Sequence, residues 1–178
     1  MKIIACLGNP EKKYAFNRHN IGFAVGDYLA GKFGVSVNKN SFSSFCGSGK
    51  IDGVDVLFLF PQTYMNNSGK AVAAAKEFYH SEISDIIAIH DELEIPFGSV
   101  NVKKGGGHKG HNGIRSIASS LGSADFYRLR FGIGRPVNTA MSIADYVLSN
   151  FSDEERVLLN GFIENVETEF IKIIQDVD

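Results

Sequence analysis

The sequence of 178 residues has no tryptophan, only four prolines and only two cysteines. Cys6 and Cys46 are too few for a disulfide framework and lack the spacing of a zinc site. No apolar run is long enough to span a bilayer, and the first run breaks at Pro10, which argues against a secretory signal peptide. We therefore expect a cytoplasmic protein without a membrane partner.

An excess of charge of either sign is also missing. Lys and Arg number 18 and Asp and Glu number 20, so the formal net charge is −2. No overall basic field marks a nucleic-acid-binding protein, and an anionic partner would need a local group of basic side chains. The 44% apolar and 21% charged residues are ordinary for a globular protein. The length suits one domain, over residues 1–178.

Short apolar runs alternate with helical patterns along the chain. The patterns predict strands at 2–7, 43–51, 54–60, 86–89, 99–103 and 126–133, and helices at 21–33, 68–79, 114–121 and 143–148. A final helix follows the Ser152–Glu155 capping box, with one apolar stripe as far as Ile174. Alternating strands and helices predict a single-domain α/β fold whose mixed, mostly parallel central sheet is flanked by helices. Asp52-Gly53 indicates a type I′ hairpin, which makes the sheet mixed.

Two details of the helices are predicted from the same patterns. The helix after Ser68 is expected to bury Val72, Ala75, Phe78 and Tyr79 on one face. Its N-cap is expected at Asn67 or Ser68.

Polar residues gather directly after the predicted strands. They lie at 9–20, 64–67, 90–92 and 108–112. Ligands bind at the carboxyl ends of strands in α/β sheets, so we expect these residues to share one edge of the sheet. The last group belongs to the glycine-rich segment 105–113, GGGHKGHNG, which predicts a loop that holds a ligand; a flexible surface loop is the alternative.

Three chemistries fit these polar residues to different degrees. A metal site from His90, Asp91, His108 and His111 lacks a familiar ligand spacing. A dinucleotide site would need a glycine-rich turn after the first strand, where the chain has Gly8-Asn9-Pro10. A hydrolase fits best, with a His base and an Asp that orients it. His19 lies at the start of a helix, whose dipole favours the neutral imidazole. No Ser or Cys stands in a nucleophile elbow, which favours direct attack by water.

Two further groups remain ambiguous on the residues alone. Tyr64-Met65-Asn66 suits a sugar or base face and a peptide group, but equally suits a loop that plugs the core. Arg128 and Arg130 share one face of a strand, either as solvated charges or as a small phosphate-binding patch.

Five segments together resemble bacterial peptidyl-tRNA hydrolases, in order and spacing, from Ile3 to about Phe151. They read LGNPEKKYAFNRHNIGF, PQTYMNNSGKAVAA, HDELEIPFGSVNVKKGGGHKGHNGIRSI, RLRFGIGRP and DYVLSNF. The resemblance implies a monomeric α/β hydrolase without metal, cofactor or obligate protein partner. Its substrate would be peptidyl-tRNA, contacted at the acceptor end and the nascent peptide. The ester between the peptide and the ribose would be cleaved, which recycles tRNA from aborted translation.

The resemblance also implies roles for individual residues. His19 would be the general base that activates water, Asp91 would hold it in its basic form, and Asn9 would help to distinguish peptidyl-tRNA from aminoacyl-tRNA. Substrate would be bound near the ester by Tyr14, Tyr64, Met65, Asn66 and Asn112, with His111 supporting the loop. Lys103, Arg128 and Arg130 would be candidates for tRNA phosphate contacts.

The sequence departs from the family pattern at several positions. Glu11 and Asn17 replace a usual Gly and Thr, Asn101 stands where a basic residue is common, and the C-terminal part is acidic. These departures predict fewer phosphate contacts and a shallower salt dependence of tRNA binding. The alternative function is a non-catalytic RNA-binding relative of the same fold.

Overall fold

The computed structural model describes residues 1–176, and its centre is one seven-stranded sheet. The strand order is β2-β3-β4-β1-β5-β7-β6. The bounds are β1 Lys2–Cys6, β2 Lys39–Ser41, β3 Ser44–Ile51, β4 Val54–Pro61, β5 Ile86–Glu92, β6 Val100–Lys104 and β7 Tyr127–Gly132.

The predicted mixed sheet is confirmed. The four central strands β4, β1, β5 and β7 run parallel. β3 and β2 extend the sheet antiparallel at one side, and β6 extends it antiparallel at the other. Asp52 and Gly53 have φ of +48° and +82°, the two positive values that a type I′ hairpin turn requires.

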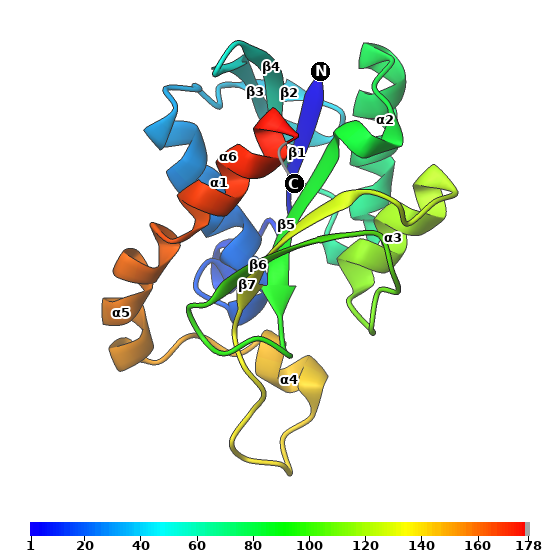
Figure 1. Cartoon of the computed structure of the whole chain (residues 1–178). Helices are drawn as coiled ribbons and strands as arrows, with labels where there is room; N and C mark the ends of the chain where they lie inside the picture. Colours follow the sequence, from blue (N-terminus) through cyan, green and yellow to red (C-terminus); the bar gives the residue numbers. More distant parts are fainter. Residues whose placement is uncertain (177–178) are drawn as a thin grey trace.

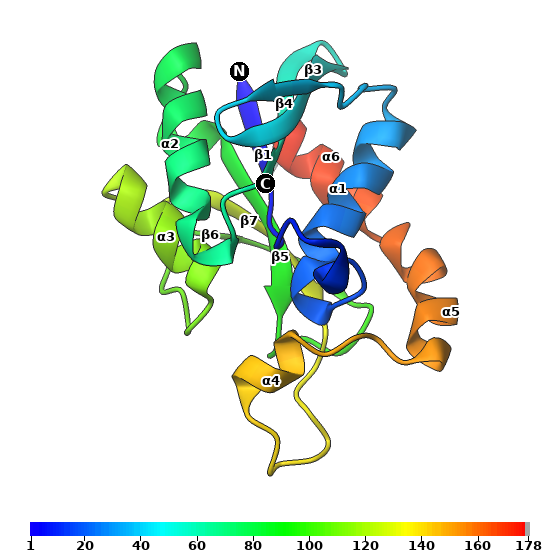
Figure 2. The same cartoon turned by 180° about the vertical axis from the view of Figure 1, so that it is seen from behind.

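Helices cover both faces of the sheet (Figures 1 and 2). α1 (Ile21–Lys32) and α6 (Val166–Gln175) lie on one face, and α2 (Ser68–Tyr79) and α3 (Asn112–Leu121) lie on the other. α4 (Ile143–Val147) and α5 (Asp153–Ile163) lie toward one end of the molecule. Four short 3-10 helices complete the described elements: η1 Lys12–Tyr14, η2 Arg18–Asn20, η3 Met65–Asn67 and η4 Ile83–Asp85.

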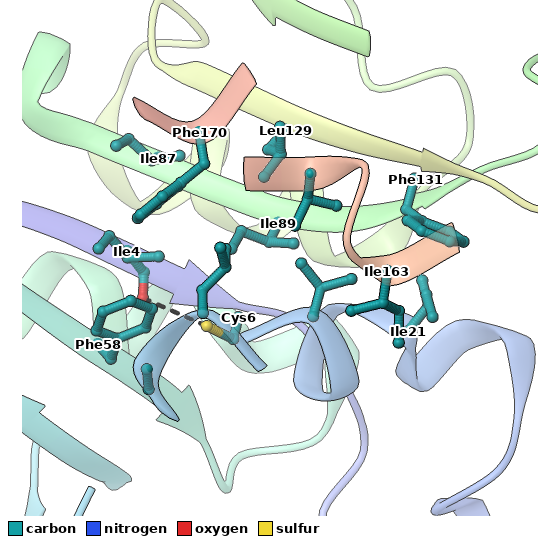
Figure 3. Close-up of a cluster of buried hydrophobic side chains, with 14 of the residues drawn as sticks. Ile4, Cys6, Ile21, Phe58, Ile87, Ile89, Leu129, Phe131, Ile163 and Phe170 are labelled. Carbon is teal, nitrogen blue, oxygen red and sulfur yellow. Dashed lines mark hydrogen bonds between the residues drawn. The ribbon is translucent and has the colours of Figure 1, made fainter. Parts of the chain in front are cut away.

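The central strands β1, β4 and β5 are mostly apolar, as expected for strands buried on both faces, and β5 ends in the polar residues His90, Asp91 and Glu92. In β1, Ile4 and Cys6 contribute to the core under α1 and α6, whereas Ile3 and Ala5 contribute to the core under α2 and α3. Figure 3 shows the first of these cores, with Phe170 of α6 above the sheet. Cys6 is therefore a core thiol, and burial raises its pKa well above the usual value.

Three details of the secondary structure differ from the sequence prediction. The predicted final helix is two helices, because the chain turns between Ile163 and Val166 so that α6 lies on the sheet and α5 packs at Phe97. Phe78 is 66% exposed and not on the buried face of α2. The short edge strand β2 is an addition; its three exposed polar residues gave no strand pattern.

The helix start at α2 also differs in its chemistry. Asn67 occupies the N-cap position, but its side chain makes no capping hydrogen bond. The hydroxyl of Ser68 donates instead to the Met65 carbonyl at 2.9 Å.

The glycine-rich segment does not follow a strand of the expected direction. β6 is antiparallel to β7, so its last residue, Lys104, pairs with Tyr127 at the opposite edge of the sheet. The chain then returns along the sheet through 105–111, and α3 begins at Asn112. The loop reaches the carboxyl edge only at its end.

No helix among the described residues is long and apolar enough to cross a membrane.

Two glycines test how tightly the helices are packed. A Cβ at Gly69, where α2 begins, would collide with the backbone carbonyl of Ser116 in α3, whereas a Cβ at Gly31 in α1 would meet open space. We expect Gly69→Ala to lower the free energy of unfolding by about 1–3 kcal/mol through overpacking. Gly31→Ala should raise it by about 0.5–1 kcal/mol through backbone entropy. Urea unfolding of both variants measures this, and equal effects would contradict the packing.

Candidate active site

Segments that are distant in the sequence meet at the carboxyl edge of the parallel strands. Asn9 follows β1, Met65 follows β4, and Asp91 is part of β5. His19 comes from η2, which leads directly into α1, and His111 is the N-cap of α3. The expected convergence of the polar groups is therefore present.

One buried carboxylate binds two histidines. Nδ1 of His19 donates to Asp91 at 2.9 Å, and Nε2 of His111 donates to the same Oδ1 atom at 2.8 Å. The two imidazole rings are 4.9 Å apart between centroids. No more than 10% of any of these three side chains is exposed, so the hydrogen bonds are shielded from water.

The hydrogen bonds fix the tautomer of each histidine. Nδ1 of His111 accepts from the backbone N–H of Gly113 and of Ile114, at 3.2 and 3.3 Å, and so caps α3. In this geometry Nδ1 of His111 is the acceptor and Nε2 is the donor. His19 donates through Nδ1, which leaves Nε2 as an acceptor. His19 lines the cleft, and Nε2 has no protein partner within residues 1–176.

Opposing effects act on the charges in this group. Burial lowers the pKa of His19, but the Asp91 carboxylate and its hydrogen bond outweigh burial, so that the pKa is raised overall. Burial raises the pKa of Asp91, and His19 and His111 together hold that pKa well below its usual value. Asp91 is therefore ionised at neutral pH. The carboxylate makes His19 a stronger base than a free imidazole.

Asn9 is fixed by two other segments. Its backbone N–H donates to Oδ1 of Asn20 at 2.8 Å, and its carbonyl accepts from Nδ2 of Asn20 at 2.9 Å. Its own Oδ1 accepts from the backbone N–H of Met65 at 2.8 Å. The amide orientation is thus determined, and Nδ2 of Asn9 remains a donor for a ligand.

Met65 packs where α3 begins. A Cβ at Gly113 would lie 2.5 Å from its sulfur, so a larger residue there would displace the Met65 side chain. Asn112 stands beside Gly113 at the surface, and its Oδ1 accepts from Arg115 at 2.8 Å, which directs the amide. Asn66, next to Met65, is exposed. Asn9 is thus joined to Met65, and Asn112 lies beside the glycine that packs on the Met65 sulfur; of these residues, Asn112 lines the cleft.

A cleft of about 440 Å³ extends from His19 and Asn112 along the loop 107–112. One side is apolar and includes α4. The other side is basic, and its cationic side chains come from β6, β7 and the loops beyond them: Lys103, Lys109, Arg128, Arg130 and Arg135.

The two strand arginines have partners within the protein. Arg128 is buried and donates to the carbonyls of Gly106 and Gly107 at 2.5 and 2.8 Å, so it holds the glycine-rich loop. Arg130 binds Glu92 at 2.9 Å and also donates to Oδ1 of Asn101. Neither is a freely solvated strand charge, which excludes that interpretation of the pattern.

Tyr64 and Tyr14 lie near Glu11, one of the unusual residues of the sequence. Tyr64 donates its hydroxyl to Glu11, and Lys13 pairs with Glu11 at 3.1 Å. The Lys13 ammonium also lies 4.9 Å from the centre of the Tyr14 ring. The extra carboxylate is therefore neutralised locally and connects the loop after β1 to the loop after β4.

The structure shows the contacts of the other residues that depart from the family pattern. Asn101 faces Arg130, as described, and Asn17 donates to the Leu148 carbonyl. In the acidic C-terminal part, Asp176 binds Lys2 at 2.8 Å. The last two residues of that tail lie outside the described residues.

The metal alternative can be judged from the donor atoms. His19, Asp91 and His111 place three potential ligand atoms within 4.8 Å of one another. The two histidine nitrogens that face Asp91 each donate a proton to it, so a metal bound at these two nitrogens would have to displace both protons. His108 does not join them, because its Nδ1 accepts from the backbone N–H of Gly110 in the exposed loop. The absence of a metal from the function remains a prediction.

His90 is buried beside this group with one unused nitrogen. Its Nδ1 donates to the Asp91 carbonyl at 2.6 Å, while Nε2 has no partner among the described residues. Its ring lies edge-on to that of His111, with centroids 4.7 Å apart. Burial, and next the neighbouring His111, lower the pKa of His90 to about 3. His90 therefore stays neutral wherever the protein is folded at ordinary pH.

Two supporting residues belong to the predicted polar group 9–20, but neither was assigned a role from the sequence. Asn20, which fixes Asn9, stands directly after His19. Arg18 is buried although it is an arginine, and nothing in the local pattern indicates burial.

His90 gives a prediction about pH and stability. An unfolded histidine binds a proton near pH 6.5, whereas folded His90 does so only near pH 3. The unfolded chain therefore takes up the extra proton, and the contribution of His90 to the free energy of unfolding falls by about 1.4 kcal/mol per pH unit as the pH drops from 6.5 toward 3. His90→Gln should flatten this slope between pH 6 and 4, measured by urea unfolding.

The control for that measurement is His80→Asn, which changes a surface histidine at φ +51°, a conformation that asparagine accepts. It should keep the wild-type slope. Identical slopes in all three proteins would show that His90 is not the group responsible.

Comparison with known proteins identifies the family of the chain. A sequence model described as "Peptidyl-tRNA hydrolase" matches residues 3–178. The peptidyl-tRNA hydrolases of Geotalea daltonii and Geobacter sulfurreducens are each 50% identical over 171 residues, which is 94% of this chain and 88% of each relative. The crystal structure of peptidyl-tRNA hydrolase from Acinetobacter baumannii superposes with a TM-score of 0.90 at 38% identity, covering 99% of this chain and 89% of that one. The chain belongs to the peptidyl-tRNA hydrolase family.

Proposed function

We propose that this protein hydrolyses the ester bond between peptide and tRNA in peptidyl-tRNA, with a water molecule activated by His19. The observation that carries the proposal is the buried bond of 2.9 Å between His19 and Asp91, which leaves Nε2 free as an acceptor on a side chain that lines the cleft. Family membership supplies the substrate class.

The mechanism follows from the tautomer of His19. Nε2 accepts a proton from water while the water oxygen attacks the ester carbonyl. Asp91 stabilises the imidazolium that forms, without accepting its proton. The imidazolium then protonates the ribose oxygen as the ester bond breaks, which yields a peptide carboxylate and a free hydroxyl on tRNA. A general base of this kind contributes a factor of about 10²–10⁴.

The amide groups suit a substrate of variable sequence. Asn9, Asn66 and Asn112 can bind peptide backbone groups, which every peptide has, without reading side chains. Asn9 offers a donor, because its oxygen is used by Met65. A peptide presents a carbonyl acceptor at this place, whereas the free ammonium of an aminoacyl-tRNA is a donor. This mismatch is the basis we propose for the discrimination by Asn9.

The remaining contacts divide between the two sides of the site. Tyr14, Tyr64 and Met65 provide apolar surface for the peptide side. On the basic side of the cleft, Lys103 and Arg130 contact phosphates of the acceptor end. Arg128 adds its charge beneath the loop that it holds. The enzyme works as a cytoplasmic monomer of one domain, without cofactor or obligate protein partner.

His19→Ala tests the function. The variant should lose most turnover, by about 10²–10⁴-fold, while binding of the substrate is kept, because His19 acts on water. The measurement is release of free tRNA from an N-blocked aminoacyl-tRNA, with binding followed separately. His80→Asn serves as the histidine control and should be fully active. Near-normal hydrolysis by His19→Ala would reject the role of His19, and an inactive wild-type protein that still binds tRNA would favour the non-catalytic alternative.

Lys103→Ala tests the phosphate side. Loss of one phosphate contact should weaken tRNA binding and reduce the slope of log K against log salt by about 1. Lys39→Ala removes an exposed lysine from the remote edge strand β2 and should change neither the affinity for tRNA nor the salt slope. A Lys103→Ala slope equal to that of the wild type would place the phosphates elsewhere.

A further inference from the structure

Arg18 directly precedes the proposed catalytic base, yet only 10% of its side chain is exposed. A buried guanidinium is costly unless its donors are satisfied. The partners of Arg18 all lie in one segment, residues 146–155, which is more than 120 positions away in the sequence. This segment begins in α4 and ends in α5.

The guanidinium binds that segment at several points. Nη1 donates to the hydroxyl of Ser149 at 2.8 Å and to the carbonyl of Asn150 at 2.6 Å. Nη2 binds Glu155 at 2.8 Å. The guanidinium carbon also lies 4.5 and 5.3 Å from the ring centres of Tyr146 and Phe151, respectively. The planar group is therefore fixed in both direction and tilt.

The backbone makes the same connection. The N–H of Arg18 donates to the Ser149 carbonyl at 3.1 Å, and the N–H of Phe151 donates to the Phe16 carbonyl at 3.1 Å. Asn17 and Asn150 form an isolated antiparallel bridge between these bonds. The turn that carries His19 is thus paired with this segment, and it is not a free loop.

Glu155 extends the connection to α5. The oxygen that binds Arg18 also accepts from the backbone N–H of Ser152 at 2.7 Å. In return, Ser152 caps the N–H of Glu155 at 3.1 Å. The capping box predicted from sequence therefore has a second function, because its carboxylate orients the neighbour of His19.

The other end of the segment forms a wall of the cleft. Ile143, Ala144 and Val147 of α4 line the cleft together with His19 and Asp91. The Tyr146 hydroxyl donates to the Ile133 carbonyl just after β7, at 2.8 Å. α4 is therefore attached to the sheet on one side and to the His19 turn on the other.

We propose that Arg18 is a positioning residue. It holds the His19 imidazole against Asp91 and fixes its position relative to the cleft wall formed by α4. This inference rests on the proposed role of His19 as the general base.

A purely stabilising role explains the contacts less well. Well-packed apolar residues commonly replace a buried ion pair without loss of stability. Nε of Arg18 is buried without a partner among residues 1–176, so the arrangement is not optimal for stability. What an apolar side chain cannot provide is fixed direction, which the forked hydrogen bonds supply to the backbone on either side of His19.

Arg18→Lys is the principal test, because it keeps the charge and removes the fork. A misplacement of about 1 Å can cost up to about 10²-fold in rate, so we expect kcat to fall about 10- to 100-fold with little change in KM. Glu155→Gln keeps an acceptor for Ser152 and weakens only the bond to Arg18. It should show the same effect to a smaller extent.

The titration of His19 provides the readout that a structural role would not move. Asp91 on β5 and His111 at the start of α3 are the groups that face His19, and Asp91 raises the pKa of His19. If the imidazole shifts away from Asp91 while remaining buried, its pKa should fall. The acidic limb of the profile of kcat/KM against pH should then move to lower pH, and NMR of the His19 ring should report the same shift.

The control is Tyr28→Phe, which removes the hydrogen bond from Tyr28 in α1 to Glu167 in α6, away from the cleft. It should lower the melting temperature without changing kcat or the pKa of His19. The proposal would be overturned if Arg18→Lys and Glu155→Gln behaved like this control, with kcat and the His19 pKa both unchanged.

Two safeguards keep the outcome decisive. If Arg18→Lys fails to fold, Ser149→Ala removes one acceptor of the guanidinium and, with Glu155→Gln, carries the same comparison. If the wild-type protein releases no tRNA, the proposed function fails, but the NMR titration of His19 still tests whether Arg18 positions the ring.

Discussion

The site depends on one buried charge, the carboxylate of Asp91. An ionised carboxylate is stable in the interior only when donors satisfy it, and here His19 and His111 provide them. Each donor is in turn held by another element: His19 by the turn paired with residues 149–151, and His111 by the amides that begin α3. The positions of α1, α3 and β5 at this edge of the sheet are thus linked through a single group.

Much of the fold could be predicted because the residue types of a strand depend directly on whether its two faces are buried. The apolar runs of β1, β4 and β5 match burial on both faces, and Asp52-Gly53 has the conformation that its sequence requires. The direction of a strand is a different matter. Alternation predicts β6 equally well in either direction, so sequence could not show that the glycine-rich loop starts at the far edge and returns. The helical pattern of apolar residues also continues through the turn between α5 and α6, so the sequence predicted one helix in place of two.

The sequence predicted which side chains gather at the site, but not which residues hold them in place. Polar residues after buried strands indicated which side chains gather, and the resemblance indicated His19 and Asp91. The partners of Arg18 and Arg128 lie more than 100 and about 20 positions away, in loops whose course depends on the whole fold. From the sequence alone, the guanidinium of such an arginine is expected to contact either solvent or a ligand. That it instead donates to backbone carbonyls of the same chain is visible only in the folded structure.

The capping of α3 by His111 has a consequence for the division of roles between the two histidines. Two imidazoles touch one carboxylate, but Nδ1 of His111 is occupied by two backbone amides. Both ring nitrogens of His111 are therefore bound to the protein, whereas Nε2 of His19 has no protein partner within residues 1–176. The second histidine is a structural part of the start of α3, and the first is the one whose free nitrogen is open to substrate and water.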